Sequence, residues 1–207
     1  MKRPIVFLLA VMLLCGGTAV ASKPPKALPA SAYPEVDAHP QERVSIAADP
    51  FDTPERTKFL RVNYQKNDLL IVRVVITNAG DRPIKLDDVR IQFISAANDR
   101  IPAALPEEVD RRMSDVRDPT HKVLRSPLPI PLPQRSPIFR KVEQDMNEFG
   151  FNALTVEPHT TQSGFLWYDV SDLQKPVLRG AQIYVKMVKD ADGKTLFPFT
   201  IPFAAEK

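Results

Sequence analysis

The chain has 207 residues, with 28 Lys and Arg against 25 Asp and Glu, and 43% of its residues are hydrophobic. This composition is typical of a globular protein and excludes a chain that is disordered throughout. A single cysteine, Cys15, excludes a disulfide framework, a cysteine zinc cluster and a paired-cysteine redox site. The length suits one domain, or at most two small ones.

Residues 1–21 have the layout of a secretory signal peptide. A basic start at residues 2–3 precedes an apolar run over residues 5–14, and Ala19-Val20-Ala21 supplies the small residues that a signal peptidase recognises before Ser22. The apolar run is too short to cross a bilayer core of about 30 Å as a helix. We therefore expect export to the periplasm or the extracellular space, and a mature chain without a transmembrane segment.

Cleavage at this site changes two properties of the chain. Cys15 could mark a bacterial lipoprotein, but Leu14 precedes it where lipoprotein processing requires a small residue, so lipid attachment is disfavoured. Loss of Lys2 and Arg3 lowers the net charge from +3 to +1. A nearly neutral chain has no general attraction to polyanions, so we expect no nucleic-acid partner.

Residues 22–41 are predicted to form a disordered, proline-rich leader. Five prolines interrupt a stretch rich in Lys, Ala and Ser, and such a composition favours an extended spacer over a recognition peptide. The remaining residues, 42–205, are expected to form a single β-sandwich domain.

The first half of this domain carries a β pattern. Residues 44–47, 59–64 and 89–93 are predicted strands, separated by segments rich in Asp, Asn, Gly and Pro. Leu69–Thr77 is apolar at nearly every position, which predicts a central strand that is buried on both faces.

The pattern stops at Asn98 and resumes near Leu154, leaving an insertion over residues 99–150. Pro106–Met113 is a predicted short helix, because proline opens it, acids come early and arginines late. A second helix is predicted to begin at Ser136-Pro137 and to end at Gly150. One apolar stripe identifies its buried face: Ile138, Val142, Met146 and Phe149.

Between the two predicted helices lies Ser126–Pro133, in which proline alternates with other residues and enforces an extended polyproline-II conformation. Its apolar side chains, Leu128, Ile130 and Leu132, admit two interpretations. They pack as a strap against the protein's own β domain, which we favour, or they offer a contact to another envelope protein, since partners bind such preformed chains in aromatic grooves.

Further strands are predicted at 154–156, 164–170 and 181–187. Alternation places Phe165 and Trp167 on one face of their strand and Leu166 and Tyr168 on the other. Packing in the core explains these aromatic residues better than a carbohydrate-stacking platform does.

The chain ends in a predicted hairpin. Asp190–Gly193 resembles the start of a calcium loop, but Lys194 and Ile201 stand where further oxygen ligands are needed, so a hairpin turn is favoured. The last strand alternates Phe197, Phe199, Ile201 and Phe203 with smaller residues. Pro198 and Pro202 share its other face and lack backbone donors, which predicts a strand at a sheet edge.

No catalytic or metal-binding motif is evident. The three histidines, His39, His121 and His159, are far apart in sequence, so no local metal site is expected and no cofactor is implied. The mature chain lacks both cysteine and a Gly-x-Ser-x-Gly nucleophile motif. Clustered carboxylates such as Glu107 and Glu108 suit a solvated helix face. We therefore expect a protein that is not an enzyme.

Three segments carry a family resemblance. The sequence VRVVITNAGDRPIKL (Val72–Leu86) resembles the strand–turn–strand signature of exported bacterial immunoglobulin-like domains. Two later segments, TTQSGFLWYDV (Thr160–Val170) and LRGAQIYVKMVKDADGKTLFPFTIPF (Leu178–Phe203), resemble the later strands of uncharacterised exported proteins of this kind. The resemblance implies a mainly β, antiparallel immunoglobulin-like sandwich and a role in binding, spacing or assembly. It implies no catalytic residue.

These observations favour a non-enzymatic protein-binding or assembly module of the cell envelope. The predicted contact residues are Leu128, Ile130, Leu132, Pro198 and Pro202. A periplasmic carrier of a small ligand is the alternative, and it would need an apolar pocket between the insertion and the β domain with a few convergent polar groups. A hydrolase is a weaker alternative.

Overall fold

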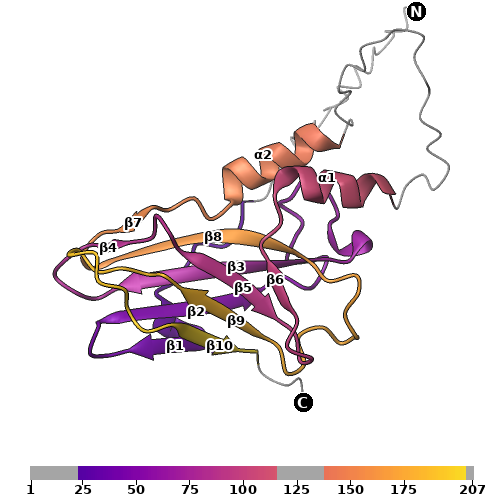
Figure 1. Ribbon diagram of the computed structural model, residues 1–207. Coiled ribbons are helices and arrows are strands. Elements are labelled where there is room, and N and C mark those ends of the chain that lie inside the picture. Colours follow the sequence, from indigo (N-terminus) through magenta and orange to yellow (C-terminus); the bar gives the residue numbers. More distant parts are fainter. Residues whose placement is uncertain (1–22, 116–137, 204–207) are drawn as a thin grey trace, which may run out of the picture.

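Two four-stranded antiparallel sheets face each other, and a third layer of two helices covers the outer face of one of them (Figure 1). The computed structural model describes residues 23–115 and 138–203. The first sheet has the strand order β1 (Val36–His39), β2 (Val44–Pro50), β3 (Leu69–Asn78), β8 (Thr160–Asp169). The second has the order β10 (Phe199–Pro202), β9 (Gln182–Lys186), β5 (Arg90–Ile94), β6 (Arg100–Pro102).

The remaining elements are short. Strands β4 (Ile84–Lys85) and β7 (Thr155–Val156) pair with each other. The helices are α1 (Pro106–Asp115) and α2 (Phe139–Phe149), with single 3-10 turns η1 (Ala30–Ala32) and η2 (Gln65–Asn67). The prediction of a mainly β, antiparallel protein is confirmed.

Strand β3 is the centre of the first sheet, as its apolar sequence predicted. It pairs along its whole length with β8 on one side, and over residues 72–78 with β2 on the other. Its even-numbered residues, such as Val72 and Val74, face the second sheet, while Leu69 and Ile71 face the helices. Because both faces of β3 are covered, the side chains on both faces are apolar. The strand therefore reads as a continuous apolar run and lacks the alternation of apolar and polar residues that a half-exposed strand shows.

The core between the two sheets follows from period-two alternation in the second sheet. Three pairs of inward-facing residues meet the first sheet: Ile91 and Phe93, Ile183 and Val185, and Phe199 and Ile201. Each such side chain contributes about 1.5–3 kcal/mol through removal of apolar surface from water.

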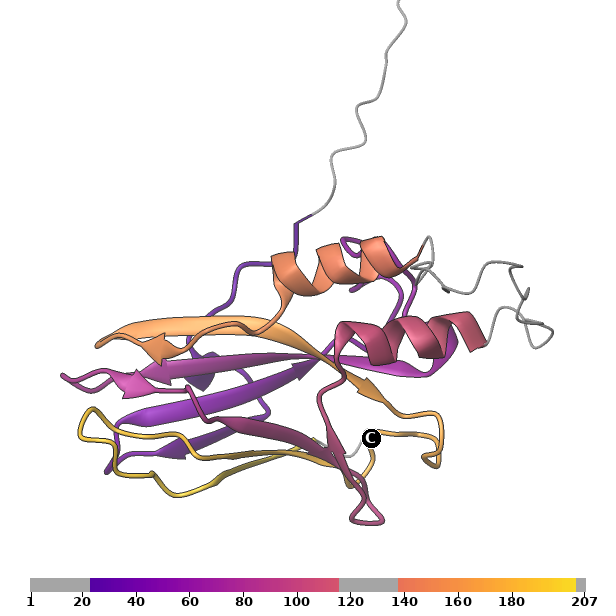
Figure 2. The same ribbon diagram turned by 45° about the horizontal axis from the view of Figure 1, so that its top comes forward.

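A second core lies under the helices, which Figure 2 shows above β8 and β3. Val109 and Met113 of α1 and Val142 of α2 pack there against aromatic residues of the first sheet, including Phe165 and Trp167. Both helices were predicted, and the predicted stripe on α2 faces this core. The predicted partition of β8, with Leu166 and Tyr168 on the opposite face, is also confirmed.

The expectation of a disordered leader at 22–41 is wrong for the part that the structure describes. The leader contains η1 and β1, and β1 pairs with β2 in the first sheet. Ala30 is fully buried against Ala47 and Val75, and its backbone N–H donates to the Thr77 hydroxyl. The prolines of the leader lie outside β1, with Pro34 before it and Pro40 after it, so they remove no donor from its pairing with β2.

Two further predictions need correction. Residues 59–64 were expected to form a strand, but they form turns that pack Phe59, Leu60 and Tyr64 under the helices. The insertion was expected to lack strands, yet β6 lies within it and pairs with β5. A three-residue strand is too short to show alternation, so the sequence pattern could not reveal it. The proline stretch between the helices lies outside the described residues.

Candidate functional site

The edge strands β1 and β10 belong to different sheets but lie beside each other, and we call this region the seam. Strand β10 occupies the edge of the second sheet (Figure 1), as Pro198 and Pro202 predicted, and both prolines are exposed. The structure therefore brings these two predicted contact residues together on one surface.

The outward edge of β10 has no backbone N–H to offer to a further strand. In antiparallel pairing the backbone groups of alternate residues point to the same side, and here the outward positions are 198, 200 and 202. Pro198 and Pro202 lack an N–H group. The N–H of Thr200 donates to Asp37 Oδ2 at 2.7 Å. Addition of a partner strand at this edge is therefore disfavoured.

Side chains from β1 and the turn after it close the seam. The His39 ring stacks on Phe199 with 3.9 Å between the ring centroids. Its Nδ1 lies 2.8 Å from Glu42 Oε2, and its Nε2 lies 3.6 Å from Asp37 Oδ2. Glu42 Oε1 in turn accepts the backbone N–H of Phe197 at 3.1 Å. One imidazole thus links two carboxylates that each bind the backbone of the β10 segment.

In sequence, Phe197 continues the alternating apolar residues Phe199, Ile201 and Phe203, which are buried. The side chain of Phe197, however, is 77% exposed. It precedes the first paired residue of β10, where the chain has passed the end of the core. Met187, which follows β9, has a left-handed backbone (φ 66°) and is 37% exposed, so the regular pairing of β9 and β10 is interrupted before it reaches Phe197. Phe197 and Met187 are thus two exposed apolar residues at the end of the β9–β10 pair where this pairing stops.

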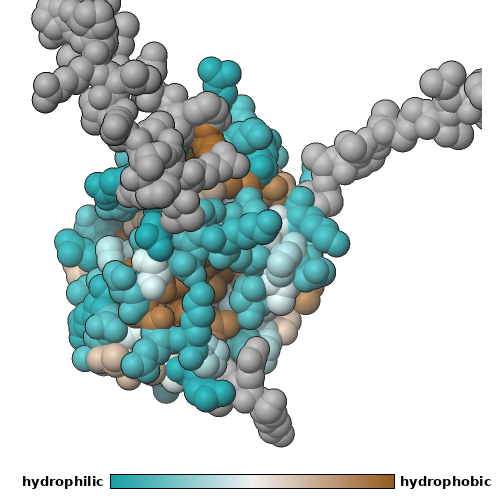
Figure 3. Space-filling model, turned by 90° about the vertical axis from the view of Figure 1, so that its right-hand side faces the viewer, coloured by the Kyte–Doolittle hydropathy of each residue, from teal (hydrophilic) through white to brown (hydrophobic). Residues whose placement is uncertain are grey.

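A separate cleft of about 410 Å³ opens at the end of the molecule where the β8–β9 connection crosses from one sheet to the other. Figure 3 views the molecule from this side and shows apolar surface framed by hydrophilic residues. The lining is mostly apolar and comprises Leu69, Leu70, Val170, Pro176, Val177 and Leu178, with Asp52, Gln65, Asp68, Lys175 and Arg179 as its polar members.

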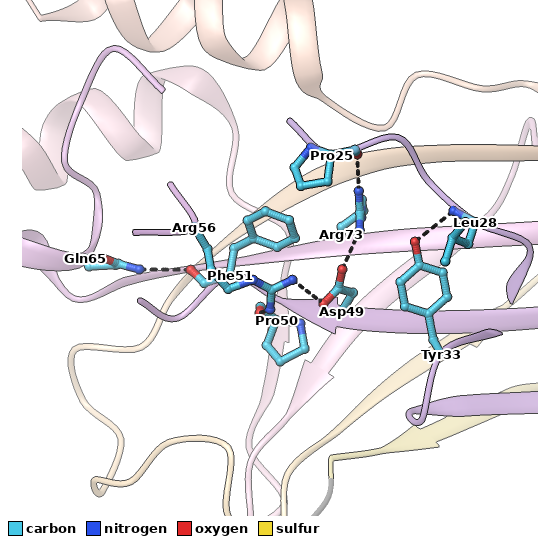
Figure 4. A network of polar contacts seen from close by, with 9 residues as sticks. All are labelled: Pro25, Leu28, Tyr33, Asp49, Pro50, Phe51, Arg56, Gln65 and Arg73. Atoms are coloured by element: carbon cyan, nitrogen blue, oxygen red, sulfur yellow. Dashed lines mark hydrogen bonds and ion pairs between the residues drawn. The ribbon is translucent and has the colours of Figure 1, made fainter. Parts of the chain in front are cut away.

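A buried polar network positions the wall of the cleft formed by Asp52 and Gln65 (Figure 4). Arg73 of β3 is 5% exposed and lies between Asp49 Oδ2, at 2.6 Å, and the Pro25 carbonyl, at 2.7 Å. Arg56 binds the other oxygen of Asp49 at 2.7 Å. Beside this network Gln65 donates to the carbonyl of Phe51 at 2.9 Å, which ties η2 to the chain that leads to Asp52.

The charged groups of the cleft differ in how they are paired. Asp68 accepts a hydrogen bond from Lys175 Nζ at 2.8 Å and lies 3.8 Å from an Arg112 nitrogen. Asp52 and Arg179 make no ion pair or side-chain hydrogen bond with any other residue in the ranges 23–115 and 138–203. They come from opposite sides, since Asp52 follows β2 of the first sheet and Arg179 precedes β9 of the second.

The predicted contact residues Leu128, Ile130 and Leu132 lie outside the described residues, and so does His121. His39 and His159 lie apart, His39 in the seam and His159 on an exposed turn where its Nε2 is 3.1 Å from Asp81 Oδ1. The sequence did not predict the end cleft, because the segment 175–179 has no regular pattern. Two pairs in and beside this segment, Lys175-Pro176 and Arg179-Gly180, are its sequence signals: proline and glycine are typical of turns, and each is preceded by a basic residue.

Asp190–Gly193 forms the predicted hairpin turn. Asp190 Oδ1 accepts the backbone N–H groups of Asp192 and Lys194, each at 2.9 Å, so this oxygen stabilises the turn. Within the described part of the chain, no three His, Cys, Asp or Glu side chains are grouped so that they could hold a metal ion. Neither of the two α-helices in the described residues, α1 and α2, is long and apolar enough to cross a membrane.

No family model matches the chain, and none of the curated proteins matches it.

Proposed function

We propose that this chain is an exported, non-enzymatic protein-binding or assembly module of the cell envelope, and that it contacts its partner through the seam. The observation that carries the proposal is the 77% exposure of Phe197, next to the exposed Pro198. Aromatic residues, phenylalanine included, are enriched in protein interfaces relative to the rest of the surface. The signal sequence at 1–21 supports the periplasm or the extracellular space as the location.

The backbone of the seam supports contact through side chains. Its edge offers no N–H group, so a partner would gain affinity by burying Phe197 and the two prolines rather than by adding a strand. Two antiparallel sheets that share one core support the immunoglobulin-like assignment of the fold. The resemblance to exported immunoglobulin-like domains implies binding or assembly, although a fold alone never determines function.

The test uses a photocrosslinking phenylalanine analogue at position 197 in cells that express the full chain. Leu105, 62% exposed at the start of α1, provides the matched control position. We expect a discrete crosslinked product from position 197 and none from position 105. Capture of the same partner should fall about 10-fold or more in Phe197→Ser and stay unchanged in Leu105→Ser. Equal behaviour at the two positions would contradict the proposal.

A periplasmic carrier is the second candidate function, and the end cleft is the observation that favours it. Its volume and apolar lining with a few charged groups are typical of small-ligand sites. The cleft lies between the start of β3, the turns that precede it and the β8–β9 connection, so this candidate does not depend on a pocket beneath the insertion.

A further inference from the structure

The end cleft carries an inference that goes beyond protein binding at the seam. Leu69 and Leu70 at the start of β3 and Val170 after β8 line one part of the cleft, so this part belongs to the first sheet. Val177 and Leu178 of the β8–β9 connection form the facing wall. A volume of about 410 Å³ is enough for a few side chains of a ligand.

The charges at the rim restrict the ligand further. Asp68 is satisfied by Lys175, so neither of these two groups needs a ligand. Asp52 and Arg179 are without ion partners among the described residues, and they reach the cleft from different segments, Asp52 after β2 of the first sheet and Arg179 before β9 of the second. A ligand that uses the whole cleft therefore has an apolar body, one cationic end and one anionic end.

We propose that the cleft binds a short apolar peptide with free termini, of about two or three residues. Its ammonium group pairs with the Asp52 carboxylate, its carboxylate pairs with the Arg179 guanidinium, and its side chains lie on Val170, Val177 and Leu178. Ligand clefts are typically about 300–1,000 Å³ in volume, and a cleft near the lower end of that range suits a ligand as small as a di- or tripeptide. An apolar monocarboxylate would satisfy Arg179 alone.

The experiment measures binding by calorimetry and by NMR shift mapping, with protein exported from cells that express the full chain. The probes are trileucine, N-acetyl-trileucine, trileucine amide and decanoate. We expect trileucine to bind and to perturb residues 175–179. Because exposed ion pairs contribute little, each blocked terminus should weaken binding by only about 2- to 5-fold.

Two variants assign each terminus to its charge. Asp52→Asn should weaken trileucine about 2- to 5-fold but leave N-acetyl-trileucine unaffected, and Arg179→Gln should behave in the same way toward trileucine amide. Lys194→Gln, in the distant β9–β10 hairpin, is the control and should change nothing. All substituted residues are exposed, so circular dichroism should show an unchanged fold.

Three outcomes would overturn the proposal: no binding of trileucine at millimolar concentration, blocked peptides that bind as tightly as trileucine itself, or decanoate binding as tightly as trileucine. The first would leave the cleft without this ligand class, while the last would reassign it to anionic amphiphiles. None of them bears on crosslinking at Phe197, so the protein-binding proposal is tested separately.

Discussion

Asp145 of α2 accepts a hydrogen bond of 2.8 Å from the Tyr64 hydroxyl, and the carboxylate is completely shielded from solvent. Arg61 completes its coordination with a backbone N–H and with Nη1 at 2.8 Å. A buried carboxylate is tolerated only where hydrogen bonds and a counter-charge replace its water. This cluster therefore fixes α2 against the turns that precede β3, and with them the wall of the end cleft.

Replacement of the two buried tyrosines by phenylalanine should have opposite effects. Tyr64→Phe removes a hydrogen bond to a charged group and should lower the free energy of unfolding by about 1.5 kcal/mol or more. The Tyr168 hydroxyl has no hydrogen-bond partner among the described residues, so Tyr168→Phe should be neutral or stabilise by up to about 1 kcal/mol. Urea unfolding of the two variants checks this, and equal losses would contradict it.

Stability should decline above about pH 10, the ordinary range of tyrosine ionisation. Burial raises the pKa of Tyr64, as does the adjacent Asp145 carboxylate, and burial alone raises the pKa of Tyr168. The unfolded chain releases these protons first, so the unfolded state gains relative to the folded state as pH rises. The double variant Tyr64→Phe/Tyr168→Phe should show a shallower decline in its urea midpoint between pH 9 and 11.

Gly164→Ala should lower the free energy of unfolding by about 2 kcal/mol. The 150–151 chain crosses β8 at this glycine, and an added Cβ would lie 2.4 Å from the Phe151 Cα and 2.7 Å from the Gly150 carbonyl oxygen. Backbone atoms cannot yield as a flexible side chain does. Ser163→Ala, at the exposed neighbouring position, is the control and should remain within about 0.5 kcal/mol of the native protein.

Arg73→Met should release the leader and lower the free energy of unfolding by about 3 kcal/mol, because it leaves Asp49 buried with one cation fewer. Arg56 still binds Asp49, which keeps the loss at the low end for a broken buried pair. Trypsin should then cleave after Lys26 faster than in the native protein. Arg56→Gln is the control: it preserves the contact between Arg73 and Pro25, so its cleavage after Lys26 should stay at the native rate. Cleavage of Arg73→Met at that same native rate would contradict the prediction.

The sequence predicted those elements in which the pattern of apolar residues and prolines directly reflects which faces are buried or which strand lies at an edge. Strand β3 is apolar on both faces because both faces are covered, α2 carries one apolar stripe because one face packs, and Pro198 and Pro202 mark an edge. In each case the local pattern and the tertiary position impose the same residues.

Other features depend on partners that are distant in sequence. Strand β1 exists because β2 offers it an edge, and nothing in residues 36–39 alone separates a strand from an extended spacer. The end cleft combines four separate stretches of chain, which periodicity cannot bring together. Asp145 did leave a signal, since it lies on the apolar stripe of α2 three residues after Val142, where a charge needs a buried partner.

The contact between Arg73 and the Pro25 carbonyl fixes the chain only four residues into the expected mature protein. Four extended residues span at most about 14 Å. If residues 1–21 are the signal peptide that the sequence predicts, an uncleaved precursor would hold its folded domain within about that distance of the membrane, and cleavage before Ser22 would leave an N-terminus whose fourth residue is already bound to β3.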